Sequence, residues 1–220
     1  MSTLVSRIIG DMARITRAER QAATRADILA AARARFLRDG YAPTSLEQIA
    51  EDAGYSKGAV YSNFRDKPTL CREVLEAIHD TKLGEVRSII AADRDIDELL
   101  ADIEDWLERT VGDVGWTMLE MEFAVVSRGN VELTRMIGSL HGGMHDAIVT
   151  ALRGVGARLG LADESDRTYS EFADLIVATT FGLGVQRAVD PTISIRPAVQ
   201  AIRGVVATLT AGGSSTPAAR

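Results

Sequence analysis

Apolar side chains recur every three or four positions along most of this chain, the spacing that places them on one face of an α-helix. The first such stripe contains Ile28, Ala32 and Phe36. Thr24 is the expected N-cap of this helix, and Gly40 stands where a C-terminal glycine ends it. No segment alternates apolar and polar residues as a half-buried strand does, so the pattern predicts an all-α protein.

A second helix is predicted to begin at the hydroxyl residues that follow Gly40. Ser45 and Gln48 have the three-residue offset of a capping box, and so do Thr44 and Glu47, so either hydroxyl can begin the helix. The helix is short and is expected to end near residue 54, a glycine that turns the chain.

A third, very short helix is expected to follow with Ser56 as its cap. Val60 and Phe64 are four residues apart in it, on the side that we expect to be buried. Asp66 is the expected cap of a fourth and longer helix. Two short helices joined by a tight turn with glycine form a helix-turn-helix; the alternative is a plain helical corner.

The remainder of the chain predicts longer helices. Their apolar stripes lie within residues 99–107, 116–126, 133–159, 169–184 and 199–209, with Asp190-Pro191 as a break before the last. We therefore expect a larger C-terminal helical domain that shares the fourth helix with the first module. The expected divisions are a flexible arm at 1–22, a helix-turn-helix module at 23–70, a helical regulatory and dimerisation domain at 71–211 and a flexible tail at 212–220.

Composition fits this reading. Apolar residues make up 46% of the 220 and aromatic residues only 5%, a balance that favours helices with a real core. The single cysteine, Cys71, excludes an internal disulfide framework and lies in an apolar pattern, so we expect a buried structural thiol. No apolar run approaches the roughly 20 residues of a membrane span. A soluble cytoplasmic protein is expected, with no membrane partner.

Charge is unevenly distributed. The chain has a formal net charge of -6, yet residues 1–70 contain 11 Lys and Arg against 8 Asp and Glu. The other residues hold 14 against 23. A positive N-terminal part in an acidic chain indicates an anionic partner for that part.

The third helix has the chemistry that such a partner needs. Its outward residues are Lys57, Gly58, Tyr61 and Ser62; lysine and hydroxyl groups suit phosphates and base edges, and the glycine permits close approach. The whole run TRADILAAARARFLRDGYAPTSLEQIAEDAGYSKGAVYSNFRDKPTL closely resembles the DNA-binding segment of the TetR (tetracycline-repressor) family of bacterial transcription regulators. The resemblance covers about residues 20–75.

The resemblance implies roles for individual residues. Thr44 and Ser45 correspond to phosphate contacts, and Tyr61 and Lys67 to an aromatic and a lysine phosphate contact. At Asn63 the family pattern gives little guidance: this side chain either reads adenine or faces solvent. The predicted DNA-binding set is Thr44, Ser45, Ser56, Lys57, Gly58, Ala59, Tyr61, Ser62, Asn63 and Lys67.

The resemblance also implies a dimer through the last two helices and a ligand cavity in the larger domain. Large side chains in the middle helices either line such a cavity or fill an ordinary core. The candidates are Trp106, Trp116, Met118, Met121, Phe123, His141, Met144, His145, Phe172 and Phe181. His141 and His145 are four residues apart, but no zinc motif accompanies them, so neither a metal ion nor a cofactor is expected.

Taken together, these features predict a dimeric regulator, in the family's usual mode a repressor of a palindromic operator, released by a small, largely apolar ligand. The alternative is a helical carrier or an enzyme without DNA binding. No nucleophile–base motif supports an enzyme. A carrier needs the pocket but not Lys57, Tyr61 or Lys67.

Overall fold

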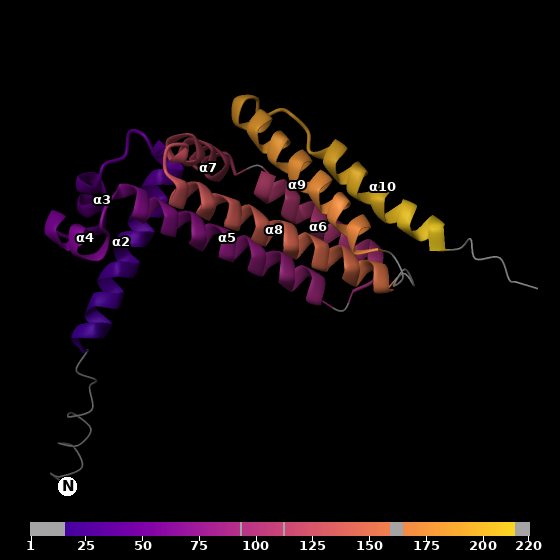
Figure 1. The fold of residues 1–220 in the computed structure, drawn as a ribbon, viewed down its shortest axis with the longest axis horizontal. Coiled ribbons are helices and arrows are strands. Elements are labelled where there is room, and N and C mark those ends of the chain that lie inside the picture. Colours follow the sequence, from indigo (N-terminus) through magenta and orange to yellow (C-terminus); the bar gives the residue numbers. More distant parts are fainter. Residues whose placement is uncertain (1–15, 93, 112, 159–164, 214–220) are drawn as a thin grey trace, which may run out of the picture.

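The computed structural model describes residues 16–92, 94–111, 113–158 and 165–213. These residues form helices and connecting turns, without a strand among them, which confirms the predicted all-α class (Figure 1). In chain order the helices are α2 (Arg17–Asp39), α3 (Leu46–Ala53), α4 (Lys57–Asn63), α5 (Lys67–Ala91), α6 (Ile96–Val111), α7 (Val114–Ser127), α8 (Val131–Arg158), α9 (Asp166–Val189) and α10 (Arg196–Gly213).

The first described helix begins earlier than the apolar stripe predicts. Thr16, not Thr24, is the N-cap of α2, because Thr16 and Glu19 form a reciprocal capping box. Residues 17–22, expected to belong to a flexible arm, are therefore helical and project from the body of the molecule (Figure 1). The rest of the predicted arm, residues 1–15, and residues 214–220 of the predicted tail lie outside the described part of the chain.

One of the two caps predicted for α3, and the caps predicted for α4 and α5, are confirmed. Ser45 and Gln48 form the capping box of α3, while Ser56 and Asp66 accept backbone hydrogen bonds at the starts of α4 and α5. Gly54 ends α3 with a φ of 73°, in the left-handed region that favours glycine. The helix-turn-helix is therefore fixed largely by bonds between near neighbours in the sequence.

One apolar core joins the small N-terminal module to the larger domain. It contains Ile28, Phe36 and Val60 of the module together with Leu119 and Phe123 of α7. Cys71 is fully buried in the same core, and burial raises the pKa of its thiol, as expected of a structural cysteine. Figure 1 shows α5 running from the module into the larger domain, so the two parts have no linker between them.

The larger domain is a layered bundle in which α5 and α8 run side by side and α9 and α10 lie along another face (Figure 1). Its α8 continues through Gly142-Gly143 without a break. The start of α10 is held by Ile195 and Val199, which pack with Leu107 and Val111 of α6. Four residues of the apolar stripe predicted within 199–209 have side chains outside the described part: Ile202, Val205, Val206 and Leu209.

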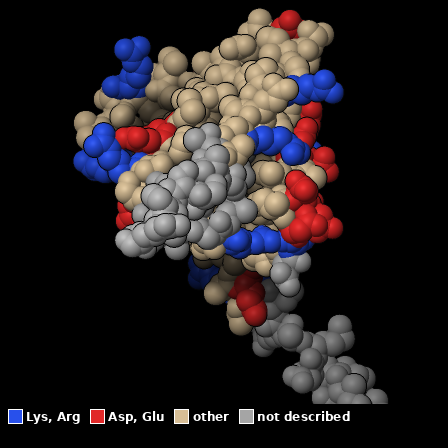
Figure 2. All heavy atoms as spheres, turned by 90° about the vertical axis from the view of Figure 1, so that its right-hand side faces the viewer, with Lys and Arg blue, Asp and Glu red and all other residues tan. Residues whose placement is uncertain are grey.

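The helix α9 is long and apolar, and only 11% of its most apolar window is buried. Leu175, Phe181 and Val189 expose much of their surface on it. By length and composition alone it also qualifies as a candidate membrane span, which the apolar pattern did not predict; a lone helix of this kind is a weak indication. The end of the molecule remote from α3 and α4 carries both signs of charge, with Asp and Glu gathered in one zone (Figure 2).

Candidate nucleic-acid interface and ligand cavity

The short helix α4 is anchored to the core of the module by two buried side chains. Val60 is fully buried and Phe64 nearly so, and Arg25 of α2 lies over the Phe64 ring at 4.5 Å. These contacts confirm that both residues are core positions. Since one face of a seven-residue helix is thus occupied, the opposite face is left outward.

The outward face of α4 presents a cation and an aromatic hydroxyl. Tyr61 is 47% exposed, and Lys57 Nζ lies 5.6 Å from its ring centroid. Lys57 also pairs with Glu47 of α3, and this hydrogen bond raises the pKa of the lysine. Ser56 and Gly58 are exposed beside them, and Ala59 is half-buried. A lysine and a hydroxyl on one face give the pair of donors that a phosphate backbone accepts.

The side chains of Ser62 and Asn63, for which the sequence pattern offered the least guidance, form hydrogen bonds with the backbone of their own helix. Ser62 Oγ donates to the Ala59 carbonyl at 2.9 Å, and Asn63 Nδ2 donates to the same oxygen at 2.8 Å. Asn63 Oδ1 is buried without a hydrogen-bond partner. The Asn63 amide is thus half-buried, and it neither faces solvent freely nor projects outward in this conformation.

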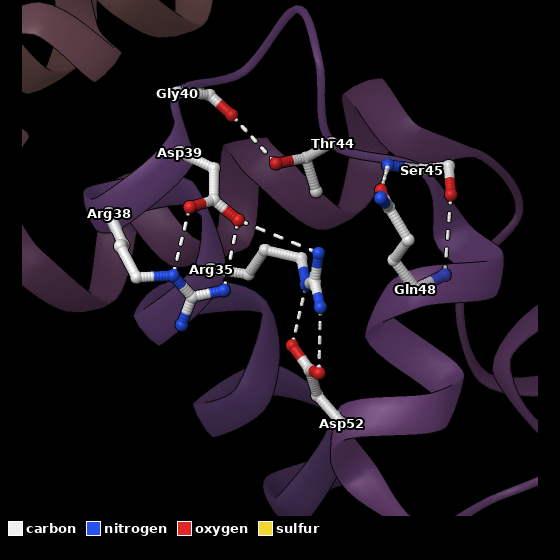
Figure 3. A network of polar contacts seen from close by, with 8 residues as sticks. All are labelled: Arg35, Arg38, Asp39, Gly40, Thr44, Ser45, Gln48 and Asp52. Atoms are coloured by element: carbon white, nitrogen blue, oxygen red, sulfur yellow. Dashed lines mark hydrogen bonds and ion pairs between the residues drawn. The ribbon is translucent and has the colours of Figure 1, made fainter.

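Two of the predicted phosphate contacts, Thr44 and Ser45, make hydrogen bonds within the module. Thr44 is 3% exposed, and its hydroxyl donates to the Gly40 carbonyl at 2.7 Å (Figure 3). Ser45 Oγ accepts from the Gln48 N–H as the cap of α3. Thr44 is therefore placed to close the loop between α2 and α3, whereas Ser45 lies at a helix start whose N–H groups favour an anion.

Lys67 is also engaged within the module. Its Nζ donates to the Ala42 carbonyl at 3.1 Å and lies 4.2 Å from the Tyr41 ring centroid. Burial lowers the pKa of this lysine. The charge is therefore held at the loop that precedes α3, beside the start of α5.

A salt-bridge network that the sequence did not reveal fixes α3 against α2. Arg35 pairs with Asp52 through Nε at 2.5 Å and Nη2 at 2.8 Å, and it also reaches Asp39 at 3.5 Å (Figure 3). Arg38 pairs with Asp39 in turn. A bidentate Arg–carboxylate contact is geometrically specific, so the network sets the angle at which α3 leaves α2.

The larger domain has a partly open cavity of about 300 Å³ between α5, α6, α7, α8 and α9. Five of the ten predicted pocket residues line it: Trp106, Trp116, His141, Met144 and Phe181. The other five lie elsewhere. Met118 is exposed, Met121 is half-buried, Phe123 packs in the core that reaches the N-terminal module, Phe172 packs against the α8–α9 core, and His145 contacts Asp146, Asp174 and Ser170.

The cavity wall contains a buried carboxylate, Glu120, that was not among the pocket residues predicted from the sequence. Glu120 is 5% exposed, and its Oε1 lies 2.7 Å from His141 Nε2 and 3.3 Å from His79 Nε2. Burial opposes ionisation of Glu120, but the hydrogen bond from His141 and the proximity of His79 outweigh it and lower its pKa to about 2. The same hydrogen bond raises the pKa of His141. His141 and His145 thus point to different partners, and no cluster able to hold a metal ion occurs among the described residues.

Three further polar side chains of the cavity wall have buried atoms without a hydrogen-bond partner. They are both ring nitrogens of His79, Thr110 Oγ1 and Trp116 Nε1. Trp106, in the same wall, differs because its Nε1 donates to Glu85 at 2.9 Å. The signal for Glu120 was available in the sequence, since this carboxylate interrupts the apolar run TMLEMEFAVV.

The helix α7 joins the cavity to the N-terminal module. Glu122, two residues after Glu120, accepts hydrogen bonds from the N–H groups of Tyr41 at 2.7 Å and Ala42 at 3.1 Å. Gly115 lies so close to the backbone of Leu37 that an added Cβ would be 2.5 Å from its carbonyl oxygen. The cavity wall and the α2–α3 loop therefore contact one and the same helix.

Comparisons with known proteins match the N-terminal module by sequence and most of the chain by structure. Residues 28–74 match a family model described as bacterial regulatory proteins, tetR family. Over 70 residues the chain is 43% identical to the HTH-type transcriptional regulator TtgR of Pseudomonas putida, covering 32% of this chain and 33% of TtgR. It is 41% identical over 75 residues to the regulator AcrR of Shigella flexneri, covering 34% of each protein. The match thus spans about a third of the length of these curated relatives.

Solved structures are similar over most of the chain. The complex of SmeT with triclosan superposes with a TM-score of 0.60 at 26% identity, over 86% of this chain and 91% of SmeT. GusR of Salmonella enterica superposes with a TM-score of 0.63 at 21% identity, over 90% and 97%. At such identity GusR shows a shared fold alone.

Proposed function

We propose that the chain is a sequence-specific DNA-binding transcriptional regulator, because residues 28–74 match the tetR family of bacterial regulatory proteins and similar regulators share this segment. The observation that carries the proposal is the outward face of α4. There Lys57 and the exposed Tyr61 stand on a helix whose other face is buried, behind a glycine turn and a capped start. The second helix of a DNA-binding helix-turn-helix enters the major groove with its outward face in the same way.

The proposed DNA contacts divide by position. Lys57, Gly58 and Tyr61 form the face that approaches the groove, while Ser45 and Lys67 lie at the starts of α3 and α5, where phosphate is favoured. Thr44 is left out of the proposed side-chain contacts because its hydroxyl is buried on Gly40. Ser62 and Asn63 contact bases only after their bonds to the Ala59 carbonyl are released.

We further propose that the protein acts as a homodimer through α9 and α10. Leu175, Phe181 and Val189 of α9 are exposed in the single chain, and a second copy that covers them would remove this surface from water. A two-fold dimer would present two α4 helices to half-sites about 34–36 Å apart, which requires a palindromic operator.

Repression released by a small, largely apolar ligand is the proposed mode of action. The cavity of about 300 Å³ lies in the larger domain, and α7 connects its wall to the α2–α3 loop. SmeT, similar in structure, is described as the repressor of the Stenotrophomonas maltophilia multidrug efflux pump SmeDEF and was solved with triclosan. A ligand acts only through its different affinity for the DNA-bound and free conformations.

Selection of bound sequences from a pool of random double-stranded oligonucleotides tests this function. We expect recovery of a palindrome whose half-sites are about one helical turn apart, or a multiple of it. The variant Tyr61→Ala, whose side chain faces outward, is expected to lose most of that enrichment. No enrichment above background with folded wild-type protein would contradict the proposal.

A further inference from the structure

The polar atoms of the cavity are concentrated around one short segment of α7. Trp116 and Glu120 are four residues apart, so both side chains lie on the same face of that helix. The His79 ring of α5 meets the Trp116 ring edge-to-face at 5.5 Å and reaches Glu120 Oε1 at 3.3 Å. Trp116, His79 and Glu120 therefore form one polar group, which we call the α7 cluster, in a wall that is otherwise largely apolar.

The α7 cluster combines an unpaired donor with a carboxylate acceptor. Trp116 Nε1 is buried and unpaired, and an indole N–H is a donor only. The two histidine contacts of Glu120 both fall on Oε1, which leaves Oε2 as the oxygen for a ligand to approach. A carboxylate oxygen is an acceptor only. A ligand group that both accepts and donates has the chemistry that matches these two atoms.

Charge restricts the ligand further. Glu120 is ionised, with a pKa lowered to about 2, and its Oε1 lies 2.7 Å from His141 Nε2, a contact that raises the pKa of His141. The other ionisable residue of the wall is His79; Lys82 lies over the Trp116 ring at 5.7 Å but does not line the cavity. An anion would meet the carboxylate of Glu120, and a cation would meet a carboxylate already paired with His141. A neutral ligand avoids both penalties.

Size and lining indicate the body of the ligand. A volume of about 300 Å³ is at the lower end of small-molecule sites. Trp106, Trp116 and Phe181 supply aromatic faces, and the Phe181 ring lies 6.2 Å from that of His141 at the partly exposed rim. Flat rings stack well against such walls.

We propose that the cavity takes a small neutral aromatic compound that carries a hydroxyl group. The hydroxyl hydrogen bonds to Glu120 Oε2, and the hydroxyl oxygen accepts from Trp116 Nε1. An effect of this ligand on DNA binding rests on the proposed function, because it requires that the chain binds DNA. Its binding chemistry stands on the α7 cluster alone.

A matched series of naphthalene compounds tests the proposal by isothermal titration calorimetry on the full chain at neutral pH. The probes are 2-naphthol, 2-methoxynaphthalene, naphthalene, 2-naphthoate and 2-naphthylmethylammonium. They share one ring system and differ in their polar group. The hydroxyl of 2-naphthol is both a donor and an acceptor, the ether of 2-methoxynaphthalene is an acceptor alone, and naphthalene has neither. 2-Naphthoate carries a negative charge and 2-naphthylmethylammonium a positive charge. We expect 2-naphthol to bind about tenfold or more tightly than naphthalene, with 2-methoxynaphthalene between them.

Two variants assign the hydrogen bonds, and a third is the control. Trp116→Phe removes the indole donor and should bring 2-methoxynaphthalene down to the affinity of naphthalene. Glu120→Gln keeps the shape of the side chain and should reduce the advantage of 2-naphthol over 2-methoxynaphthalene. Trp106→Phe lies in the same wall, but its N–H is already bound to Glu85, so the affinity ratios should stay as in the wild type. Circular dichroism melts identify any variant that fails to fold, and the wild-type series decides the proposal without them.

Several results would overturn the proposal. Naphthalene binding as tightly as 2-naphthol would show that the α7 cluster selects nothing. Tightest binding of 2-naphthoate or 2-naphthylmethylammonium would assign a charged ligand, and no binding of any probe would exclude this ligand class. A separate oligonucleotide selection without ligand keeps the two proposals distinguishable: DNA can be enriched while the probes fail, and 2-naphthol can bind while no DNA is enriched.

Discussion

Tyr61 offers a hydroxyl on the outward face of α4, away from the buried side that Val60 and Phe64 provide. Tyr61→Phe keeps the ring and removes only this donor, so DNA affinity should fall about tenfold, the usual effect of losing a hydrogen bond to a charged group. Tyr55→Phe is the matched control, because that hydroxyl donates to Asp27 at 2.8 Å within the module. Fluorescence anisotropy with the selected operator measures both. Equal losses in the two variants would contradict a phosphate contact at Tyr61.

The Lys57–Glu47 pair places a carboxylate beside the proposed DNA-facing lysine. Glu47→Gln removes a negative charge that repels phosphate and frees the lysine, so DNA affinity should rise about two- to fivefold at low salt and less at high salt. Glu51→Gln removes the same charge from α3 at a position that does not pair with Lys57. A gain no larger for Glu47→Gln than for Glu51→Gln, in the same anisotropy titration, would show that the pair does not restrain Lys57.

At the scale of elements, α7 is the helix that the cavity and the N-terminal module share. Glu122→Gln weakens the two hydrogen bonds that its carboxylate accepts from the α2–α3 loop. We expect the free energy of unfolding in urea to fall by about 1–3 kcal/mol, the usual cost for hydrogen bonds to a charged group. Glu132→Gln, at an exposed position of α8, is the control and should change it little. An unfolding energy equal to that of the control would mean that the loop does not depend on α7.

The helix α9 carries the prediction about assembly. Leu175 is half-exposed on it, and Leu175→Glu puts a charge into the proposed dimer interface. We expect light scattering at micromolar concentration to give a dimer for the wild type and a monomer for this variant. Val131→Glu, at a more exposed apolar position on α8, should remain dimeric. A wild-type monomer, or dissociation by both substitutions alike, would contradict an interface through α9 and α10.

For the whole molecule, the buried Glu120–His141 pair makes stability depend on pH. The folded pKa of Glu120 is about 2 against a usual value of 4.5, so its contribution is present above about 4.5 and is lost as pH falls towards 2. The folded pKa of His141 is raised above 6.5, so its contribution is present below 6.5 and is lost as pH rises through the folded value. The pair therefore stabilises the fold most between about 4.5 and 6.5.

Thermal melts across this range measure the effect. The difference in Tm between the wild type and Glu120→Gln should be largest between about 4.5 and 6.5 and should shrink on both sides. The Glu120 contribution is roughly 3 kcal/mol at most, and exposure of His141 to solvent reduces its share. His145→Asn is the control, since His145 does not contact Glu120. The Tm difference between this variant and the wild type should not shrink in the same way below a pH of about 4.5. A pH-independent difference would show that the pair does not titrate with folding.

The sequence by itself determined the local elements of the N-terminal module. The caps at Ser56 and Asp66, the turn at Gly54 and the core positions Val60 and Phe64 were predicted, because a cap or a helical stripe involves residues within a few positions of one another. For α3 the spacing left Thr44 and Ser45 as alternatives, and Ser45 is the cap. The same logic failed at Thr24 only because a stronger local signal, the Thr16–Glu19 capping box, lies further upstream.

Only the tertiary structure decided which large side chains surround a cavity. Helical spacing shows which face of a helix is apolar, but whether that face meets another helix or an empty volume depends on five helices packing together. Phe123 therefore fills a core with Tyr41, whereas Trp116, seven residues earlier on the same helix, lines the cavity. The place of Glu120 was decided in the same way, because His79 and His141 come from α5 and α8 and meet this carboxylate only after those helices pack against α7.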